Sequence, residues 1–449
     1  MKPLRQRTVA EAAAALRRGE ITSEAYTEGC LARIAAIEGT IGAWTFLDPE
    51  RALDQARAAD AARGAGESLG PLHGVPIGVK DIIDTADMPT ENGTPLHAGR
   101  RPTEDAAVVT FLRKAGALIL GKTVTTELAV YSPGKTRNPR NPGHTPGGSS
   151  SGSAAAVAAA MVPLAVGSQT NGSVIRPAAY CGVVGYKPSY GRISRHGVLR
   201  QSPPLDHVGV FAQTVEDAAM LAEILMVFDA RDPAMRPGDH LGLLEALRQD
   251  LPAPPRLGFV KSPYWDHAAP DAQAAFGSLV RRLEGRVEDV PLPAAFAEAA
   301  AIHRTIMEAD LAVSFAAEYA RGADRLSAVL RTMIERGQRT AATDYRQARA
   351  QAAELTASLD ALLAPFDGWI TPATTGEAPA GLDSTGSPIF CTTWTLCGVP
   401  AVTLPLLVGA TGLPLGVQVV GRSGDDARLL RTARWLEETL GRPDCPLAI

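Results

Sequence analysis

Short apolar runs that end in glycine, proline or asparagine recur along this chain and constrain its fold more than any other feature. Between residues 71 and 210 they lie at 75–79, 117–120, 163–166 and 208–211. Similar runs return at 256–260, 368–370, 401–404 and 415–420. Apolar runs of this length that alternate with helical segments favour strands buried on both faces of a sheet. Strands near both ends of the chain indicate one sheet that is completed late.

The segments between these runs predict helices. Residues 8–66 alternate apolar and charged positions at helical spacing, and Thr8 and Glu11 fit a capping box. We predict an α/β fold with a single large mixed β-sheet core that is flanked by helices on both faces. One domain is expected over 1–449, with packing helices at 8–66, the catalytic sheet core at 67–213 and 363–449, and a helical cover at 214–362.

Composition and charge argue against several classes of protein. A formal net charge of -4 gives no basic surface for nucleic acid, and no run of 18 apolar residues is present to span a bilayer. The N-terminus lacks the apolar core of a secretory signal. Five scattered cysteines lack the paired short spacing of a zinc site or redox motif; they are Cys30, Cys181, Cys391, Cys397 and Cys445. We expect a cytoplasmic protein that binds neither nucleic acid nor membranes.

Two serine clusters flank an almost pure alanine run between Pro146 and Pro177. The first cluster occupies residues 147–153, and the second occupies residues 167–173. Glycines around the serines let the backbone adopt positive φ and approach a ligand closely. Serine becomes a nucleophile once a neighbouring base activates it. The two clusters therefore predict that this segment forms the base of a catalytic site.

The base that such a serine needs is not an obvious histidine, because none of the eight histidines has a telling sequence context. Lys80 follows the apolar run 74–79. An amine buried among apolar groups shifts toward its neutral form and can then accept a proton. Taken alone, a lysine at a strand end is more often a solvated side chain.

Residues 148–152 also spell the G-x-S-x-G elbow of α/β-hydrolases, with Ser150 as the nucleophile. An elbow needs a strand that enters the turn, whereas residues 141–146 predict a proline-rich loop. The same glycines lack the Gly-Lys-Ser/Thr ending of a phosphate-binding loop, which argues against nucleotide binding.

Three separated motifs, in this order, resemble the amidase signature family. Residues 74–81 resemble its lysine strand, residues 138–150 its glycine-serine signature, and residues 167–188 its nucleophile segment. The resemblance continues at 398–401 and 412–418, so it covers nearly the full chain.

This resemblance implies a catalytic triad. By position, Lys80 is the base, Ser149 is the bridging serine, and Ser173 is the nucleophile. In the family a cis peptide bond precedes the bridging serine, which here is the bond between Gly148 and Ser149. A proton would pass from Ser173 through Ser149 to neutral Lys80 while Ser173 forms an acyl-enzyme. Such a mechanism needs no metal and no other cofactor.

The resemblance also implies an oxyanion hole made of four consecutive backbone N–H groups. They belong to Thr170, Asn171, Gly172 and Ser173. Two positions beside this segment depart from the family, which usually has aspartate in place of Gln169 and arginine in place of Ile175. Arg176 follows one step later. Because both charges are missing together, we expect that they normally form a pair and that neutral Gln169 replaces that pair here.

The family acts first on amides, and esters and carbamates can form the same acyl-enzyme. The positions that the resemblance assigns to the substrate site are Tyr131, Gly147, Gly148, Phe390 and Trp394. If these aromatic side chains line the site, the substrate is an apolar or aryl small molecule, including a urethane. Aromatic residues at such positions also serve as ordinary core, so this interpretation stays open.

Two other functions stay open. One is the amidase subunit of a glutamine-dependent tRNA amidotransferase, which releases ammonia for a partner subunit. The departures at Gln169 and Ile175 and the aromatic segment 390–394 argue against it. The other is a catalytically inactive binding protein, which the intact triad positions disfavour. The helices at 8–66 could also form a homodimer interface.

Overall fold

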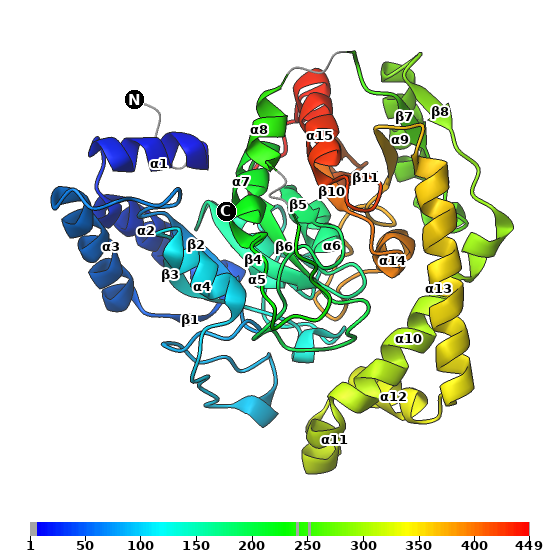
Figure 1. Cartoon of the computed structure of the whole chain (residues 1–449), viewed down its shortest axis with the longest axis horizontal. Coiled ribbons are helices and arrows are strands. Elements are labelled where there is room, and N and C mark those ends of the chain that lie inside the picture. The colour runs from blue at the N-terminus through cyan, green and yellow to red at the C-terminus, as the bar shows by residue number, and fades with distance from the viewer. Residues whose placement is uncertain (1–6, 239–241, 250–252, 449) are drawn as a thin grey trace.

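The computed structural model describes residues 7–238, 242–249 and 253–448, and eleven strands within these ranges form one sheet (Figure 1). The strands are β1 Trp44–Leu47, β2 Pro76–Lys80, β3 Leu118–Thr123, β4 Leu164–Gln169, β5 Val184–Lys187, β6 His207–Ala212, β7 Leu257–Phe259, β8 Val287–Asp289, β9 Gly368–Pro372, β10 Ala401–Val408 and β11 Pro414–Val420. Their order across the sheet is β1-β3-β2-β4-β6-β5-β10-β11-β9-β7-β8.

The sheet is mixed, as the sequence predicts. β2 runs parallel to β3 and β4, and β7 runs parallel to β8 and β9. The other neighbouring strands are antiparallel. Parallel strands are normally buried on both faces, because helices cover them. All five residues of β2 are buried, and this burial determines the environment of Lys80.

Helices cover both faces of the sheet, so the predicted α/β fold is confirmed. They are α1 Val9–Arg18, α2 Ser23–Ile41, α3 Pro49–Gly64, α4 Ala107–Lys114, α5 Ser151–Ala158, α6 Ile175–Cys181, α7 Val215–Leu225, α8 Leu243–Arg248, α9 Pro270–Arg282, α10 Ala299–Ser314, α11 Ala316–Gly322, α12 Ala328–Gln338, α13 Ala342–Leu363, α14 Ile389–Leu396 and α15 Asp426–Leu440. Figure 1 shows α1 to α3 at one end of the molecule and α9 to α13 at the other.

The alanine run between the two serine clusters forms α5, and all eight of its residues are buried. This helix packs on β2, β3 and β4. Small side chains allow the close approach, since a Cβ atom at Gly152 would lie 2.3 Å from the carbonyl oxygen of Ala43. The helix begins at Ser151, so its packing holds the first serine cluster against the sheet.

A second group of buried apolar residues lies under the helical cover. It joins α10, α12 and α13 to the sheet through side chains such as Leu311, Ile334, Trp369 and Trp394. α10 also packs against α14, so the cover reaches the segment that follows β9.

The structure contains three short strands that the sequence does not predict. β1 lies within the predicted packing helices at 8–66, β5 follows α6, and β8 lies within the helical cover. They contain four, four and three residues. The capping box of Thr8 and Glu11 is present at the start of α1.

Residues 1–6, on which part of the expectation about a secretory signal falls, lie outside the described ranges. In the part of the chain that the structure describes, no helix is both long and apolar enough to cross a membrane. All five cysteines are free, and all except Cys445 are buried.

Candidate active site

Lys80 lies at the end of β2, between β3 and β4, and its side chain is fully buried. Its Nζ donates hydrogen bonds to Ser149 Oγ at 2.7 Å and to Ser168 Oγ at 2.9 Å. The alternative of a solvated lysine is therefore wrong. The fold brings together the lysine strand and both serine clusters at one point.

Burial lowers the pKa of Lys80 well below its ordinary value, because the charged form loses its hydration. The nearby carboxylate of Asp206 opposes this effect, and the positive charge of Arg176 adds to it. The lowered pKa favours the neutral amine of Lys80 over its charged form. This amine can therefore accept a proton from the hydroxyl group of Ser149.

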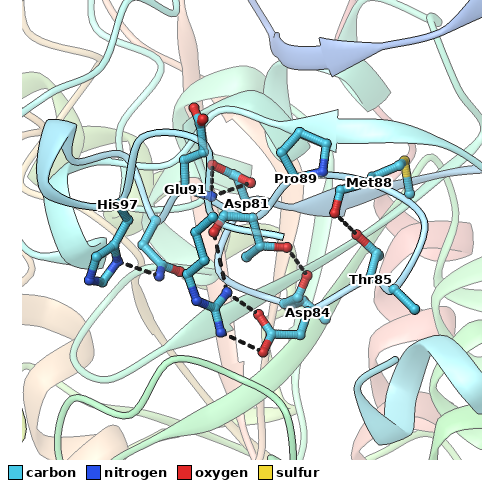
Figure 2. Close-up of polar contacts among 12 residues, drawn as sticks. Asp81, Asp84, Thr85, Met88, Pro89, Glu91 and His97 are labelled. Atoms are coloured by element: carbon cyan, nitrogen blue, oxygen red, sulfur yellow. Dashed lines mark hydrogen bonds and ion pairs between the residues drawn. The ribbon is translucent and has the colours of Figure 1, made fainter. Parts of the chain in front are cut away.

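The loop after Lys80 is fixed by a second buried lysine, Lys122. The Asp81 carboxylate accepts hydrogen bonds from the backbone N–H of Glu91 at 3.2 and 3.3 Å and lies 3.5 Å from Lys122 Nζ. Burial raises the pKa of Asp81 to about 6 and lowers the pKa of Lys122 to about 8. Figure 2 shows how the loop folds back over Asp81, with Thr85 Oγ1 donating to the carbonyl oxygen of Met88. These contacts hold the end of β2 in place.

Ser149 follows a cis peptide bond from Gly148, as the resemblance implies. Gly147 has a φ of 81°, and a Cβ atom there would lie 2.8 Å from the Cα of Pro177. Only glycine fits this position without strain. The buried guanidinium of Arg176 donates to the carbonyl oxygen of Gly148 through Nη2 at 2.7 Å and through Nε at 3.3 Å. Arg176 thus holds the peptide that carries Ser149.

Ser173 lies in the loop between β4 and α6, and 8% of it is exposed. No hydrogen bond joins its side chain to another described residue. The backbone N–H groups of residues 170–173 likewise donate to no acceptor within the described ranges. Gly172 brings the loop against α14, because a Cβ atom there would lie 3.0 Å from Pro388 Cβ.

Gln169 holds the loop that contains residues 170–173 through hydrogen bonds. Its Oε1 accepts hydrogen bonds from the backbone N–H groups of Val174 at 2.8 Å and of Ile175 at 3.0 Å. Its Nε2 donates to Thr395 Oγ1 at 2.9 Å, and Thr395 in turn donates to the carbonyl oxygen of Asn171. Gln169 is buried, and these bonds satisfy both ends of its amide. Neutral hydrogen bonds therefore hold the loop at Gln169.

Three further contacts hold the loop, and sequence reasoning does not identify them. His303 Nε2 lies 2.9 Å from the carbonyl oxygen of Thr170, and burial lowers the pKa of His303 to about 4. Thr170 Oγ1 donates to Asp206 at 2.7 Å, and burial raises the pKa of Asp206 to about 6. Thr392 Oγ1 donates to Asn171 Oδ1 at 2.8 Å. His303 has no sequence signal, because it lies on α10, more than a hundred residues after the loop.

Ser150 does not occupy a nucleophile elbow. Its hydroxyl group donates to the carbonyl oxygen of Ser168 at 3.2 Å and accepts from the N–H of the same residue at 3.3 Å. The segment before it, residues 139–149, forms turns and loop rather than a strand. The G-x-S-x-G pattern therefore has a structural role here.

A cavity of about 510 Å³ lies beside the loop, between α10, α12 and α14. Tyr131 and Asn171 line it, and Asn171 Nδ2 donates to Tyr131 Oη at 3.0 Å. Phe390 and Trp394 do not line it. They are 2% and 1% exposed, and Trp394 packs edge-on against Trp369 in the core. The cavity wall on α14 instead consists of Ile389 and Thr392.

A second cavity of about 220 Å³ lies on the other side of the loop. Ser168, Thr170 and Asp206 line it, so the loop separates the two cavities. No group of three His, Cys, Asp or Glu side chains that could hold a metal ion is present among the described residues.

The fold and this arrangement agree with a comparison of the sequence with known families. The family described as Amidase matches residues 25–430, and the chain therefore belongs to the amidase signature family. Its members include enzymes that hydrolyse carbon–nitrogen bonds, and this protein is an amidase-family hydrolase.

Individual relatives match almost end to end. A glutamyl-tRNA(Gln) amidotransferase subunit of Chloroflexus aurantiacus is 36% identical, with 96% of each chain covered. A putative amidase, AmiD, of Mycobacterium bovis is 35% identical, with 96% of this chain and 94% of the relative covered. Among solved structures, one chain superposes with a TM-score of 0.91 and 29% identity, covering 98% of this chain and all of that chain. It comes from a vestigial protein complex that reveals the evolutionary origins of an s-triazine catabolic enzyme.

Proposed function

We propose that this enzyme hydrolyses the C–N bond of amides through Ser173, Ser149 and Lys80. The observation that carries the proposal is the buried amine of Lys80, which is hydrogen-bonded to Ser149 at 2.7 Å. Serine needs a base to become a nucleophile, and a neutral lysine can act as that base. Ser149 passes the proton of Ser173 to Lys80 while Ser173 Oγ attacks the carbonyl carbon.

The remaining steps conserve atoms and protons. The Ser173 Oγ–carbon bond forms and the carbon–nitrogen bond breaks, and Lys80 returns its proton through Ser149 to the leaving nitrogen. The amine or ammonia then departs. Water, activated by the same relay, attacks the acyl-enzyme and releases the carboxylic acid.

The negative charge that develops on the carbonyl oxygen is stabilised by the backbone N–H groups of residues 170–173. Each such donor typically contributes about 3 kcal/mol to transition-state stabilisation. The bonds from Gln169 and His303 support this role, because they hold the loop in one conformation before substrate arrives.

The cavity beside the loop supports an apolar or aryl acyl group. Its apolar walls include Met307, Met333 and Ile389, and Tyr131 also lines it. Of the three aromatic positions that the sequence assigns to the substrate site, Tyr131 lines this cavity, and Phe390 and Trp394 do not. Aryl esters and carbamates, including urethanes, can react through the same acyl-enzyme.

Purified protein without partners tests this function. It should release the amine from a simple aryl amide, and Ser173→Ala should abolish this release. Ser150→Ala is the matched control, because Ser150 bonds only to the backbone of Ser168 and should keep measurable turnover. Near-normal turnover by Ser173→Ala would refute the proposal.

The amidase subunit of an amidotransferase is a second candidate, which the 36% identity to a protein of that kind favours. That function predicts hydrolysis of glutamine that depends on a partner subunit. Parallel assays of the lone protein with glutamine and with an aryl amide separate the two candidates. Turnover of the aryl amide alone favours the free-standing amidase.

A further inference from the structure

One helix contributes both a contact to the proposed oxyanion loop and a free charge to the cavity. Along α10, one face turns toward the cavity with Ala300, His303, Arg304, Met307 and Glu308. These positions follow the three- and four-residue spacing of a single helix face.

Arg304 is next to His303, which contacts the carbonyl oxygen of Thr170 in the proposed oxyanion loop. In a helix the next residue rises by only about 1.5 Å along the axis. The long side chain of Arg304 therefore starts one residue from the contact to Thr170 and lines the cavity from its exposed rim.

Arg304 is the one charged side chain of this cavity that has no partner among the described residues. Arg336 is paired with Glu308, to which it donates through Nε at 2.9 Å and also through Nη2. Burial lowers the pKa of His303 to about 4, so that ring is neutral near pH 7. Glu308 is the only acidic residue among the described residues that line the cavity. The lining therefore has a net charge of about +1.

We propose that the preferred substrate is an amide that carries one carboxylate, which Arg304 binds at the mouth of the cavity while the scissile carbonyl meets residues 170–173. This inference rests on the proposed function and names its substrate class. A guanidinium forms paired hydrogen bonds with a carboxylate. A single unpaired positive charge matches a monoanion better than a phosphate, which has a charge of nearly −2.

The side chains that line the cavity between Arg304 and residues 170–173 determine which group joins the carboxylate of the substrate to its amide. Met307 and Met333 are buried, and Val329 is exposed at the rim. Methionine side chains adapt to irregular apolar groups. The substrate thus has a short apolar or aryl spacer between its amide and its carboxylate.

Matched p-nitroanilides test the inference. Glutaryl-p-nitroanilide carries the carboxylate, and 5-methylhexanoyl-p-nitroanilide has a neutral group of the same shape in its place. We expect kcat/KM to be about tenfold or more higher for the glutaryl compound, as a charge-assisted hydrogen bond provides. In Arg304→Gln this ratio should fall to near one. Arg346→Gln, which changes an exposed arginine of α13 that does not line the cavity, should keep the wild-type ratio.

Glu308→Gln gives a prediction of the opposite sign. It removes the acidic partner of Arg336 and leaves a second free guanidinium in the cavity. The preference for the glutaryl compound should then increase. Added salt should reduce the wild-type preference, because the rim is exposed to solvent.

The experiment distinguishes failure of the carboxylate site from failure of the proposed amidase function. Equal kcat/KM for the two anilides in the wild type, or a preference that persists in Arg304→Gln, overturns the carboxylate site and leaves the amidase function intact. If neither anilide is hydrolysed, binding of both compounds to Ser173→Ala, measured by calorimetry, still decides. Tighter binding of the glutaryl compound that requires Arg304 supports the site, and equal binding overturns it.

Discussion

Gln169 offers the most specific test of how the loop is held, because it differs from the residue that the family usually has there. Methionine has a similar length but cannot accept the two backbone N–H bonds that Gln169 receives from Val174 and Ile175. A buried donor without an acceptor costs about 1–3 kcal/mol, so Gln169→Met should lower the free energy of unfolding by about 2–6 kcal/mol.

The same substitution should slow catalysis, because it loosens the loop that presents residues 170–173. Removal of one oxyanion donor typically costs about 100-fold to 1000-fold in kcat. Displacement of the loop without loss of a donor should reduce kcat by a smaller factor, about tenfold or more. Gln169→Glu retains an acceptor oxygen but puts a negative charge beside a developing anion, so kcat should fall there as well.

Urea denaturation and steady-state kinetics on an aryl amide measure both effects. Gln213→Met is the matched control, because Gln213 donates one hydrogen bond to the carbonyl oxygen of Val157, away from the loop. It should lose about 1 kcal/mol of stability and keep its kcat. Wild-type kcat in both Gln169 variants, or an equal loss of kcat in Gln213→Met, would refute the reasoning.

Three further predictions concern the proton relay and the cover helix. Lys80→Ala and Ser149→Ala should each lower kcat/KM by orders of magnitude, and near-normal steady-state rates in either variant would exclude the relay. For the wild type, a pH series of kcat/KM should rise as the pH increases through the lowered pKa of Lys80, since only the neutral amine accepts a proton; a rate that falls over this range would contradict it. The pKa of His303 is about 4 in the folded protein and 6.5 in a free histidine. The free energy of unfolding of the wild type should therefore fall by about 3 kcal/mol as the pH falls from 6.5 to 4. In His303→Gln, denaturation at these pH values should show a flatter dependence, and an unchanged slope would show that the ring is not buried as a neutral group.

Eight of the eleven described strands could be predicted from short apolar runs in the sequence. β2, β4 and β6 fall within a few residues of their predicted positions. The position of Lys80 beside Ser149 could be predicted only through the family resemblance, because no local pattern joins residues that are 69 positions apart.

The wall of the cavity on α14 could not be predicted, because it depends on which side of this helix faces the cavity. On α14, Ile389 and Thr392 are three residues apart and share the cavity side, whereas Phe390 and Trp394 are four apart and share the core side. The sequence identifies the aromatic segment but not its rotation. His303 was missed for a related reason, since tertiary packing alone brings α10 to the loop.

Ser173 is the proposed nucleophile, and an aryl fluorophosphonate labels an activated serine covalently. Purified protein is treated with the reagent, and its intact mass and peptide map are then measured. We expect a single adduct on Ser173, which disappears in Ser173→Ala and is strongly reduced in Lys80→Ala. An adduct on Ser150, or no adduct at all, would contradict this proposal.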